Sequence, residues 1–222
     1  MDANGRNLFQ AATYGDIANV RKYLDLGANI EVKDYRELTS LQIACARGHL
    51  DVVRLLLERG ANIEAAGESG QTSLILASME GHLDVVKELM DRGANIEAAE
   101  NRHGSNSLTM ASFRGKLDVV KELVNRGANI FAKNVGGVTA RQAAETKGFS
   151  EIAEFLRKKE QAIARMGLAE RVVKYQNQLN GKNVPTAVQK KIVEDYLGGR
   201  KTRRKLVRRK KLKQKQKGTR RR

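Results

Sequence analysis

The tetrapeptide Gly-Ala-Asn-Ile occurs four times in this chain of 222 residues, at 27–30, 60–63, 93–96 and 127–130. The copies are 33, 33 and 34 residues apart, and a set of glycines keeps the same step. These glycines are Gly15, Gly48, Gly81, Gly115 and Gly148. A fixed period of this length indicates structural units that each bury one face against their neighbours. The chain is therefore predicted to be a repeat array.

Each full unit has the pattern of two short helices. In the second unit, Thr39 carries a side-chain oxygen suited to capping the first helix, and Gly48 ends that helix. The second helix has an apolar stripe that includes Leu56, and it stops where Gly60 follows Arg59. The third and fourth units repeat this spacing, so each contributes two short helices to the array.

The period, the glycines and the phase of the apolar residues together resemble the ankyrin repeat over residues 4–158. The resemblance implies an all-α solenoid with three full repeats between two capping units, and it implies protein binding rather than catalysis. The predicted units are 1–33, 34–66, 67–99, 100–133 and 134–158. The 34-residue interval places one additional residue near His103, and insertions in such arrays fall at loop tips.

The family's Thr-Pro-Leu-His motif is altered throughout the chain. Serine or alanine replaces the proline at Ser40, Ser73, Ser107 and Ala140. Other residues replace the histidine at Gln42, Ile75, Thr109 and Gln142. We therefore expect hydrogen bonding between repeats, and stability, to fall below those of an array that keeps the motif.

Charge divides the chain into a near-neutral body and a basic end. Residues 1–158 hold 20 Lys or Arg against 21 Asp or Glu, whereas residues 159–222 hold 22 against 4. The segment 200–222 has 15 basic residues among 23 and no acid, so it is predicted to be a disordered tail. The residues predicted to contact nucleic acid, an import receptor or another polyanion are Arg203, Arg204, Lys205, Arg208, Arg209, Lys210 and Lys211. No aromatic residue lies among them, so nucleic-acid contact would be electrostatic and indifferent to sequence.

Residues 159–199 are predicted to form a helical appendage. A helix is expected from Gln161 to Leu179, with Gly167 as an interruption, and Pro185 introduces a second helix. Residues 184–197 resemble the opening of an F-box, as found at the ends of ankyrin proteins of large DNA viruses. The resemblance implies recruitment of a ubiquitin ligase, and the alternative is a small helix that packs back on the array.

The sequence contains little that points to catalysis. Cys45 is the only cysteine, which excludes a disulfide within the chain and a cluster of thiolates for zinc. His49 and His82 occupy positions where the ankyrin family has a histidine that ties successive loops together. We expect no enzyme activity, cofactor, metal or membrane segment, and we expect the protein in the nucleus or cytoplasm, with an infected host cell as one setting.

Partner contacts are expected on the concave face, which in the family is lined by turn tips and by the residues before each repeat glycine. Met79 and Phe113 occupy equivalent positions in adjacent repeats and are flanked by arginines, which is the composition of a binding hot spot. The candidate residues are Tyr14, Tyr35, Arg36, Leu38, Arg47, Gln71, Met79, Glu80, Arg102, His103, Phe113, Arg114 and Lys147.

Three functions are compatible with these patterns. The leading one is a protein-interaction module whose array binds a protein partner and whose tail contacts nucleic acid or directs nuclear targeting. The second is a viral-type adaptor that brings substrates to a ubiquitin ligase through residues 184–197. The third is a nucleic-acid-binding protein that is indifferent to sequence and uses the array as a scaffold.

Overall fold

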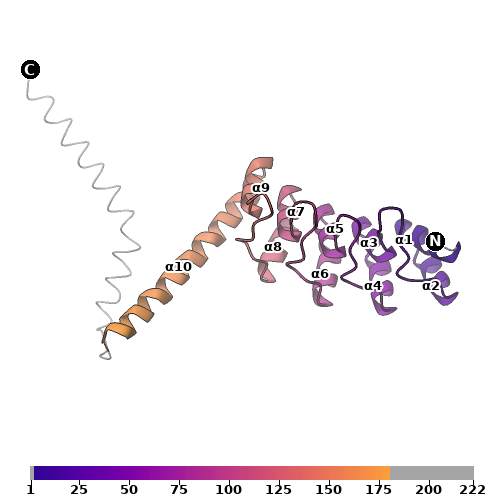
Figure 1. Cartoon of the computed structure of the whole chain (residues 1–222), viewed down its shortest axis with the longest axis horizontal. Coiled ribbons are helices and arrows are strands. Elements are labelled where there is room, and N and C mark those ends of the chain that lie inside the picture. Colours follow the sequence, from indigo (N-terminus) through magenta and orange to yellow (C-terminus); the bar gives the residue numbers. More distant parts are fainter. Residues whose placement is uncertain (1–2, 181–222) are drawn as a thin grey trace, which may run out of the picture. The chain divides into compact units, whose positions relative to one another are not determined.

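The computed structural model describes residues 3–180, with side chains as far as Arg165, and divides the chain into units Met1–Glu160 and Gln161–Arg222 (Figure 1). The described residues form an all-α structure. Its helices are α1 (Ala3–Tyr14), α2 (Ile17–Asp25), α3 (Ser40–Arg47), α4 (Leu50–Glu58), α5 (Ser73–Glu80), α6 (Leu83–Asp91), α7 (Ser107–Phe113), α8 (Leu117–Asn125), α9 (Ala140–Lys147) and α10 (Ser150–Asn180). The predicted all-α repeat array is confirmed.

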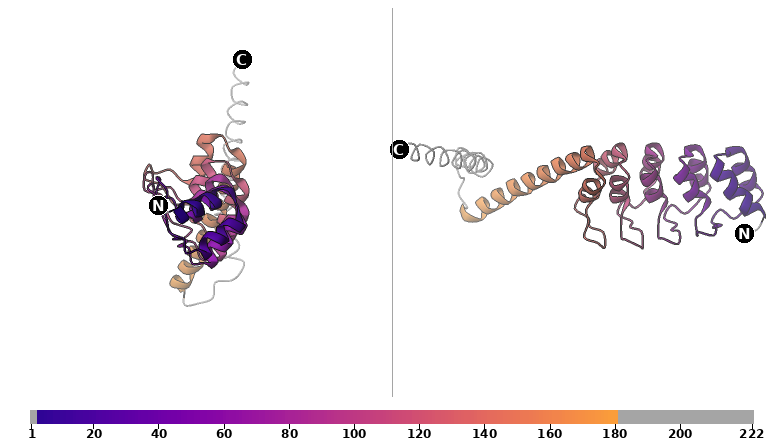
Figure 2. Two further views of the ribbon diagram at one scale, coloured as in Figure 1. Left: turned by 90° about the vertical axis from the view of Figure 1, so that its right-hand side faces the viewer. Right: turned by 90° about the horizontal axis from the view of Figure 1, so that it is seen from above.

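The first unit is built from helical hairpins that stack in two rows. Helices α1, α3, α5, α7 and α9 pack side by side in an inner row, and α2, α4, α6 and α8 pack in an outer row (Figure 1). Long turns connect each hairpin to the next, and they extend to one side of the helices (Figure 2). Each turn therefore lies beside the start of the next inner helix.

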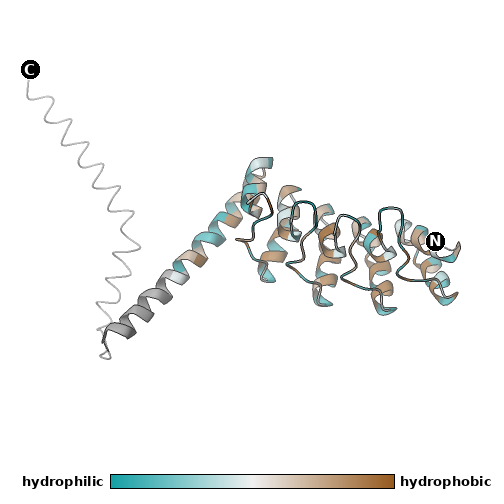
Figure 3. Ribbon diagram, viewed as in Figure 1, coloured by the Kyte–Doolittle hydropathy of each residue, from teal (hydrophilic) through white to brown (hydrophobic). Residues whose placement is uncertain are grey.

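Small residues on the inner helices allow this close stacking. Ala44, Ala77, Ala111 and Ala144 occupy equivalent positions in the inner row and are completely buried. Large apolar residues from both rows, such as Leu56 on α4, fill the space between the rows. Hydrophobic residues accordingly recur in each helical pair (Figure 3). The core is a continuous layer shared by neighbouring repeats, so no repeat buries its apolar face alone.

The inner helices begin and end as the sequence predicts. The Thr39 side chain accepts from the backbone N–H of Gln42, and Oε1 of Gln42 accepts from the backbone N–H of Thr39 at 2.9 Å. Gly48 ends α3 with φ of 77°, in the left-handed region where a side chain would be strained. In the fourth repeat Asn106 replaces the capping threonine and performs the same role.

The altered Thr-Pro-Leu-His motif has two structural consequences. Ser40 and Ser107 stand at the first position of their helices, and their buried hydroxyls have no hydrogen-bond partner among the described residues. Gln42 restores part of the lost bonding, because its Nε2 donates to the carbonyl of Ala65 at 3.0 Å and to that of Gln71 in the next repeat at 2.7 Å. Only part of the array has such bonds, because Ile75 at the equivalent position carries no polar group.

The outer row is held by ion pairs that cross from one repeat to the next. Three arginines at the ends of outer helices each contact an acid of the preceding repeat. The pairs are Arg59–Asp25 at 2.8 Å, Arg92–Glu58 at 3.8 Å and Arg126–Asp91 at 2.6 Å. A second ladder lies nearby, in which backbone N–H groups of Asn62, Asn95 and Asn129 donate to Glu31, Glu64 and Glu97, each at 2.7 Å.

Helix α10 continues past the array unit. Its first turns belong to that unit and bury Ile152 and Leu156 in the shared core. The predicted interruption at Gly167 is wrong, because α10 runs through this residue to Asn180. Glycine lowers helix stability by about 1 kcal/mol relative to alanine, and helix-forming neighbours can outweigh this. The described part of the second unit is the remainder of α10. The helix expected after Pro185 and the tail 200–222 lie outside the described residues, and the predicted domain boundaries stay predictions.

Candidate partner-binding surface

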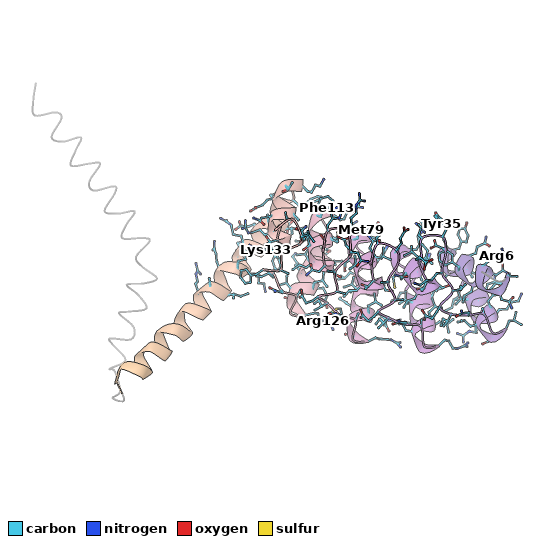
Figure 4. All side chains as sticks on the ribbon, in the orientation of Figure 1. Arg6, Tyr35, Met79, Phe113, Arg126 and Lys133 are labelled. Carbon is cyan, nitrogen blue, oxygen red and sulfur yellow. The ribbon has the colours of Figure 1, made fainter. Side chains whose placement is uncertain are left out.

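The residues that precede the repeat glycines form a row along the inner helices. Tyr14, Arg47, Glu80 and Lys147 end α1, α3, α5 and α9, Arg114 follows α7, and all five are exposed. The turn tips contribute exposed Tyr35, Arg36, Arg102 and His103. We call the surface formed by this row and the turn tips the inner surface. Tyr35, Met79 and Phe113 are labelled in Figure 4.

Leu38 differs from the expectation for a turn tip. Its side chain is only 9% exposed. A Cβ added at Gly67 in the next turn would lie 2.7 Å from its Cδ2, so the two turns are in close contact here. Leu38 therefore contributes to the packing of one turn on the next, and its accessible part forms one wall of a cavity.

That cavity, of about 450 Å³, lies between the second and third repeats. It contains six of the predicted partner residues, which are Arg36, Leu38, Arg47, Gln71, Met79 and Glu80. Its wall carries two arginines and two glutamates, Glu68 and Glu80. Both signs of charge therefore line the same cavity as the apolar side chain of Met79.

A second cavity, of about 350 Å³, lies between the fourth and fifth repeats. Predicted residues His103, Phe113 and Arg114 line it, and Met110 and Val138 add apolar walls that sequence reasoning did not select. The helical spacing of three residues between Met110 and Phe113 is the signal that could have found Met110. No carboxylate belongs to the residues that line this cavity.

Side-chain contacts connect the residues around the second cavity. The ring of Phe113 is 40% exposed, and the Lys147 Nζ lies 4.4 Å from the ring centroid. The Arg114 Nη2 lies 3.7 Å from the Met79 Sδ, which links the third and fourth repeats. Met79 and Phe113 thus each contact a cation of the inner surface, and each residue lines a different cavity.

Most cations of the inner surface lack acidic partners among the described residues. Within the described residues, Arg47, Arg102, Arg114 and Lys147 form no ion pair. Arg36 is different, because its Nε lies 3.1 Å from the Asp34 carboxylate. The unpaired cations therefore remain available to a negatively charged partner.

The turn at the additional residue is organised by one buried carboxylate. Glu100 is 5% exposed, and it accepts from the backbone N–H groups of Arg102 at 2.7 Å, His103 at 2.7 Å and Ser105 at 3.2 Å. Burial raises the pKa of Glu100, but these hydrogen bonds outweigh it, so that the net pKa is lowered. The shorter turn of the second repeat uses Asp34 in the same way. A longer side chain thus accommodates the additional residue and positions His103.

Near the first repeat lies a third cavity that sequence reasoning did not predict. It measures about 210 Å³, and Tyr14 and Tyr23 contribute its aromatic walls. Tyr14 is the one predicted partner residue that lines it. The remaining candidates, Tyr35, Arg102 and Lys147, line none of these three cavities and lie exposed around them.

The histidines and the cysteine have structural positions. The Nε2 atoms of His49 and His82 lie 3.1 Å from the carbonyl oxygens of Thr13 and Ala46, so each ring connects two repeats as the resemblance implied. Burial raises the pKa of the Cys45 thiol to about 12. Cys45 is therefore a protonated core residue at neutral pH and a poor nucleophile.

The described part of the chain holds neither a metal-ligand cluster nor a membrane-spanning helix. No group of three or more His, Cys, Asp or Glu side chains is placed there to hold a metal ion. None of the helices described between residues 3 and 180 is both long and apolar enough to cross a membrane. The predicted polyanion-binding residues, from Arg203 to Lys211, and the F-box-like segment 184–197 lie outside the described residues.

An inner surface of cavities, turns and helix ends on a helical repeat array defines a class of interaction proteins. Comparison with family models identifies the class: a model of three ankyrin repeats matches residues 8–100, and a model of a single ankyrin repeat matches residues 103–135. The chain belongs to the ankyrin repeat family, whose members are typically interaction modules without enzyme activity. No curated protein matches the chain.

Proposed function

We propose that the chain is a non-enzymatic interaction protein whose inner surface binds one protein partner and whose basic segment 200–222 contacts nucleic acid or directs nuclear import. The observation that carries the first part is the combination of two cavities with cations that have no acidic partner. Apolar centres surrounded by arginine are enriched in binding hot spots. The composition of the segment, 15 basic residues among 23, supports the second part.

Affinity capture of the full chain tests this function. The eluate is analysed by mass spectrometry with and without nuclease treatment, beside a variant that carries Phe113→Ala and Arg114→Ala. One stoichiometric protein that survives nuclease and disappears with the variant supports binding through the inner surface. Ligase scaffold subunits would instead favour the adaptor function. A set of captured proteins identical for both chains would contradict the proposal.

Deletion of residues 200–222 tests the tail separately. Each phosphate neutralised on duplex DNA contributes about −0.9 to the slope of log affinity against log salt, so six contacts predict a loss of about a thousandfold between low and moderate salt. Deletion should remove most binding to unrelated DNA and RNA and leave the thermal transition of the array unchanged. Binding that ignores salt, or that survives the deletion, would contradict a polyanion-binding tail.

A further inference from the structure

The charges that line the cavity between the fourth and fifth repeats are of more uniform sign than those of the cavity between the second and third repeats. The Arg114 cation lines it, and Lys147 lies over one of its walls, Phe113. His103 also lines it, and its Nδ1 lies 3.5 Å from the Glu100 carboxylate. No acid lines it, whereas the larger cavity between the second and third repeats carries both arginines and glutamates. A ligand of the smaller cavity thus meets an electrostatic field of mainly one sign, set by Arg114 and Lys147.

The acids closest in sequence are already engaged. The Glu100 carboxylate accepts the backbone N–H groups of its own turn. Glu145, on the same helix as Lys147, is paired with Arg141. Neither can neutralise Arg114 or Lys147 without giving up these contacts. The cations at this cavity are left for a group that comes from outside the described array.

The walls and size of the cavity limit the ligand further. Met110, Phe113 and Val138 provide apolar surface. A volume of about 350 Å³ is near the lower end of the range of roughly 300–1,000 Å³ typical of ligand cavities, so it suits a few groups and not a folded domain. A partner that uses this cavity has to insert an apolar side chain and place carboxylates beside it.

We propose that this cavity binds an acidic peptide segment, in which one aliphatic or aromatic side chain enters between Met110, Phe113 and Val138. Carboxylates next to that side chain contact Arg114 and Lys147. This inference rests on the proposed function of the inner surface and specifies the partner's chemistry. The chain's own segment 200–222 is a poor ligand, because its 15 basic residues among 23 would be repelled by these cations.

The two parts of the ligand have different roles. Burial of the apolar side chain supplies most of the affinity, because desolvated apolar contacts dominate hot spots. The carboxylates at an exposed rim select the sequence and accelerate association, and their contribution falls as salt rises. A basic peptide with the same apolar side chain is therefore rejected.

Selection from a random peptide library displayed on phage tests the proposal, with the full chain immobilised. We expect enriched peptides to carry Asp or Glu within a few residues of Leu, Ile, Val or Phe. Labelled copies of these peptides are then measured by fluorescence anisotropy. Arg114→Glu should weaken binding about tenfold or more, which corresponds to at least about 1.4 kcal/mol, and Phe113→Ala should weaken it comparably.

Lys87→Glu is the matched control. It makes the same change of charge at an exposed position on α6, outside both cavities, and should leave peptide affinity unchanged. Circular dichroism establishes that all variants are folded. Enrichment of neutral or basic peptides that depend on Phe113 would overturn the acidic preference and leave the inner surface as an interaction site. If no peptide is enriched, or if the enriched peptides bind the Arg114→Glu and Phe113→Ala variants as tightly as the original chain, the cavity is not the site.

Discussion

The outer and inner faces of the array use arginine in opposite ways. On the outer helices Arg54, Arg59, Arg92 and Arg126 all contact acids, and several of these contacts connect successive repeats. On the inner surface Arg47, Arg102 and Arg114 have no acidic partner within the described residues, although Glu68 and Glu80 line the same cavity as Arg47. The arginines of the outer face therefore stabilise the stacking of repeats, whereas those of the inner surface are left free to contact a partner.

The charged side chains of the outer helices pair with one another and so stabilise the fold. The Glu88 carboxylate accepts from Arg54 at 2.9 Å and from Arg92 at 2.8 Å, and these hydrogen bonds lower its pKa. A carboxylate that is held ionised in this way contributes stability that is lost only as the pH falls through its lowered pKa. No such arrangement exists for Arg114, so removal of its charge should affect binding and not folding.

The largest expected effect comes from the core that separates the two faces. Leu56 is completely buried, and Leu56→Ala should lower the free energy of unfolding by roughly 2–5 kcal/mol because it leaves a cavity. Phe113 is 40% exposed, so Phe113→Ala should change stability little while weakening partner binding by about 1–3 kcal/mol. Urea denaturation and binding to the captured partner measure the two quantities. Equal loss of stability in both variants would show that Phe113 belongs to the core.

The next effect concerns the turn beside the second cavity. Glu100→Ala removes the acceptor of three backbone N–H groups and should destabilise the array by about 1–3 kcal/mol. Because the folded-state pKa of Glu100 is lowered, its stabilising effect is full above the pKa of an unfolded glutamate, and it is lost as the pH falls through the lowered value. The difference between original and variant should therefore shrink in acid.

Exposed Glu68 at the neighbouring turn is the control for this change. Within residues 3–180 no hydrogen bond or ion pair involves its side chain, so Glu68→Ala should leave unfolding unchanged. A pH-independent difference for Glu100→Ala would mean that the Glu100 side chain acts through packing and not through its charge. In that case the conformation of the turn at 100–105 would not depend on an ionised carboxylate.

Most of the fold could be predicted from the sequence because it depends on local patterns. The glycine at 48 and the threonine at 39 mark helix ends through their own backbone and side-chain chemistry. The continuation of α10 through Gly167 could not be predicted from that residue alone, because it depends on the summed helix preferences of many neighbours. Residues such as Arg114 could be placed on a face by resemblance to the family. Their lack of ion pairs, and the cavity wall formed by Val138, depend on contacts between repeats that no local pattern specifies.

The inner row also allows a stabilising change. Ser40 is buried at the first position of α3, with an unpartnered hydroxyl, and Thr39 before it has φ of −82° and ψ of 167°. This conformation suits a residue that precedes proline, and the first helical position tolerates proline because its N–H has no helical partner. Ser40→Pro should therefore raise the free energy of unfolding by about 0.5–1 kcal/mol in urea denaturation. A loss of stability would mean that neighbouring side chains leave no room for the ring.

The smallest effect directly compares the two faces. Arg126 lies 2.6 Å from Asp91 of the preceding repeat and 2.9 Å from Glu122. Among the described residues, by contrast, the one side chain that Arg114 hydrogen-bonds is Met79, through its sulfur. Arg126→Ala should lower the thermal midpoint slightly at low salt, and the difference from the original chain should fade at high salt because exposed pairs are screened. Arg114→Ala should leave the midpoint unchanged at both salt concentrations and weaken only the partner. If Arg114→Ala lowered the midpoint with the same salt dependence, its cation would serve the fold as the outer arginines do, and the contrast between the faces would disappear.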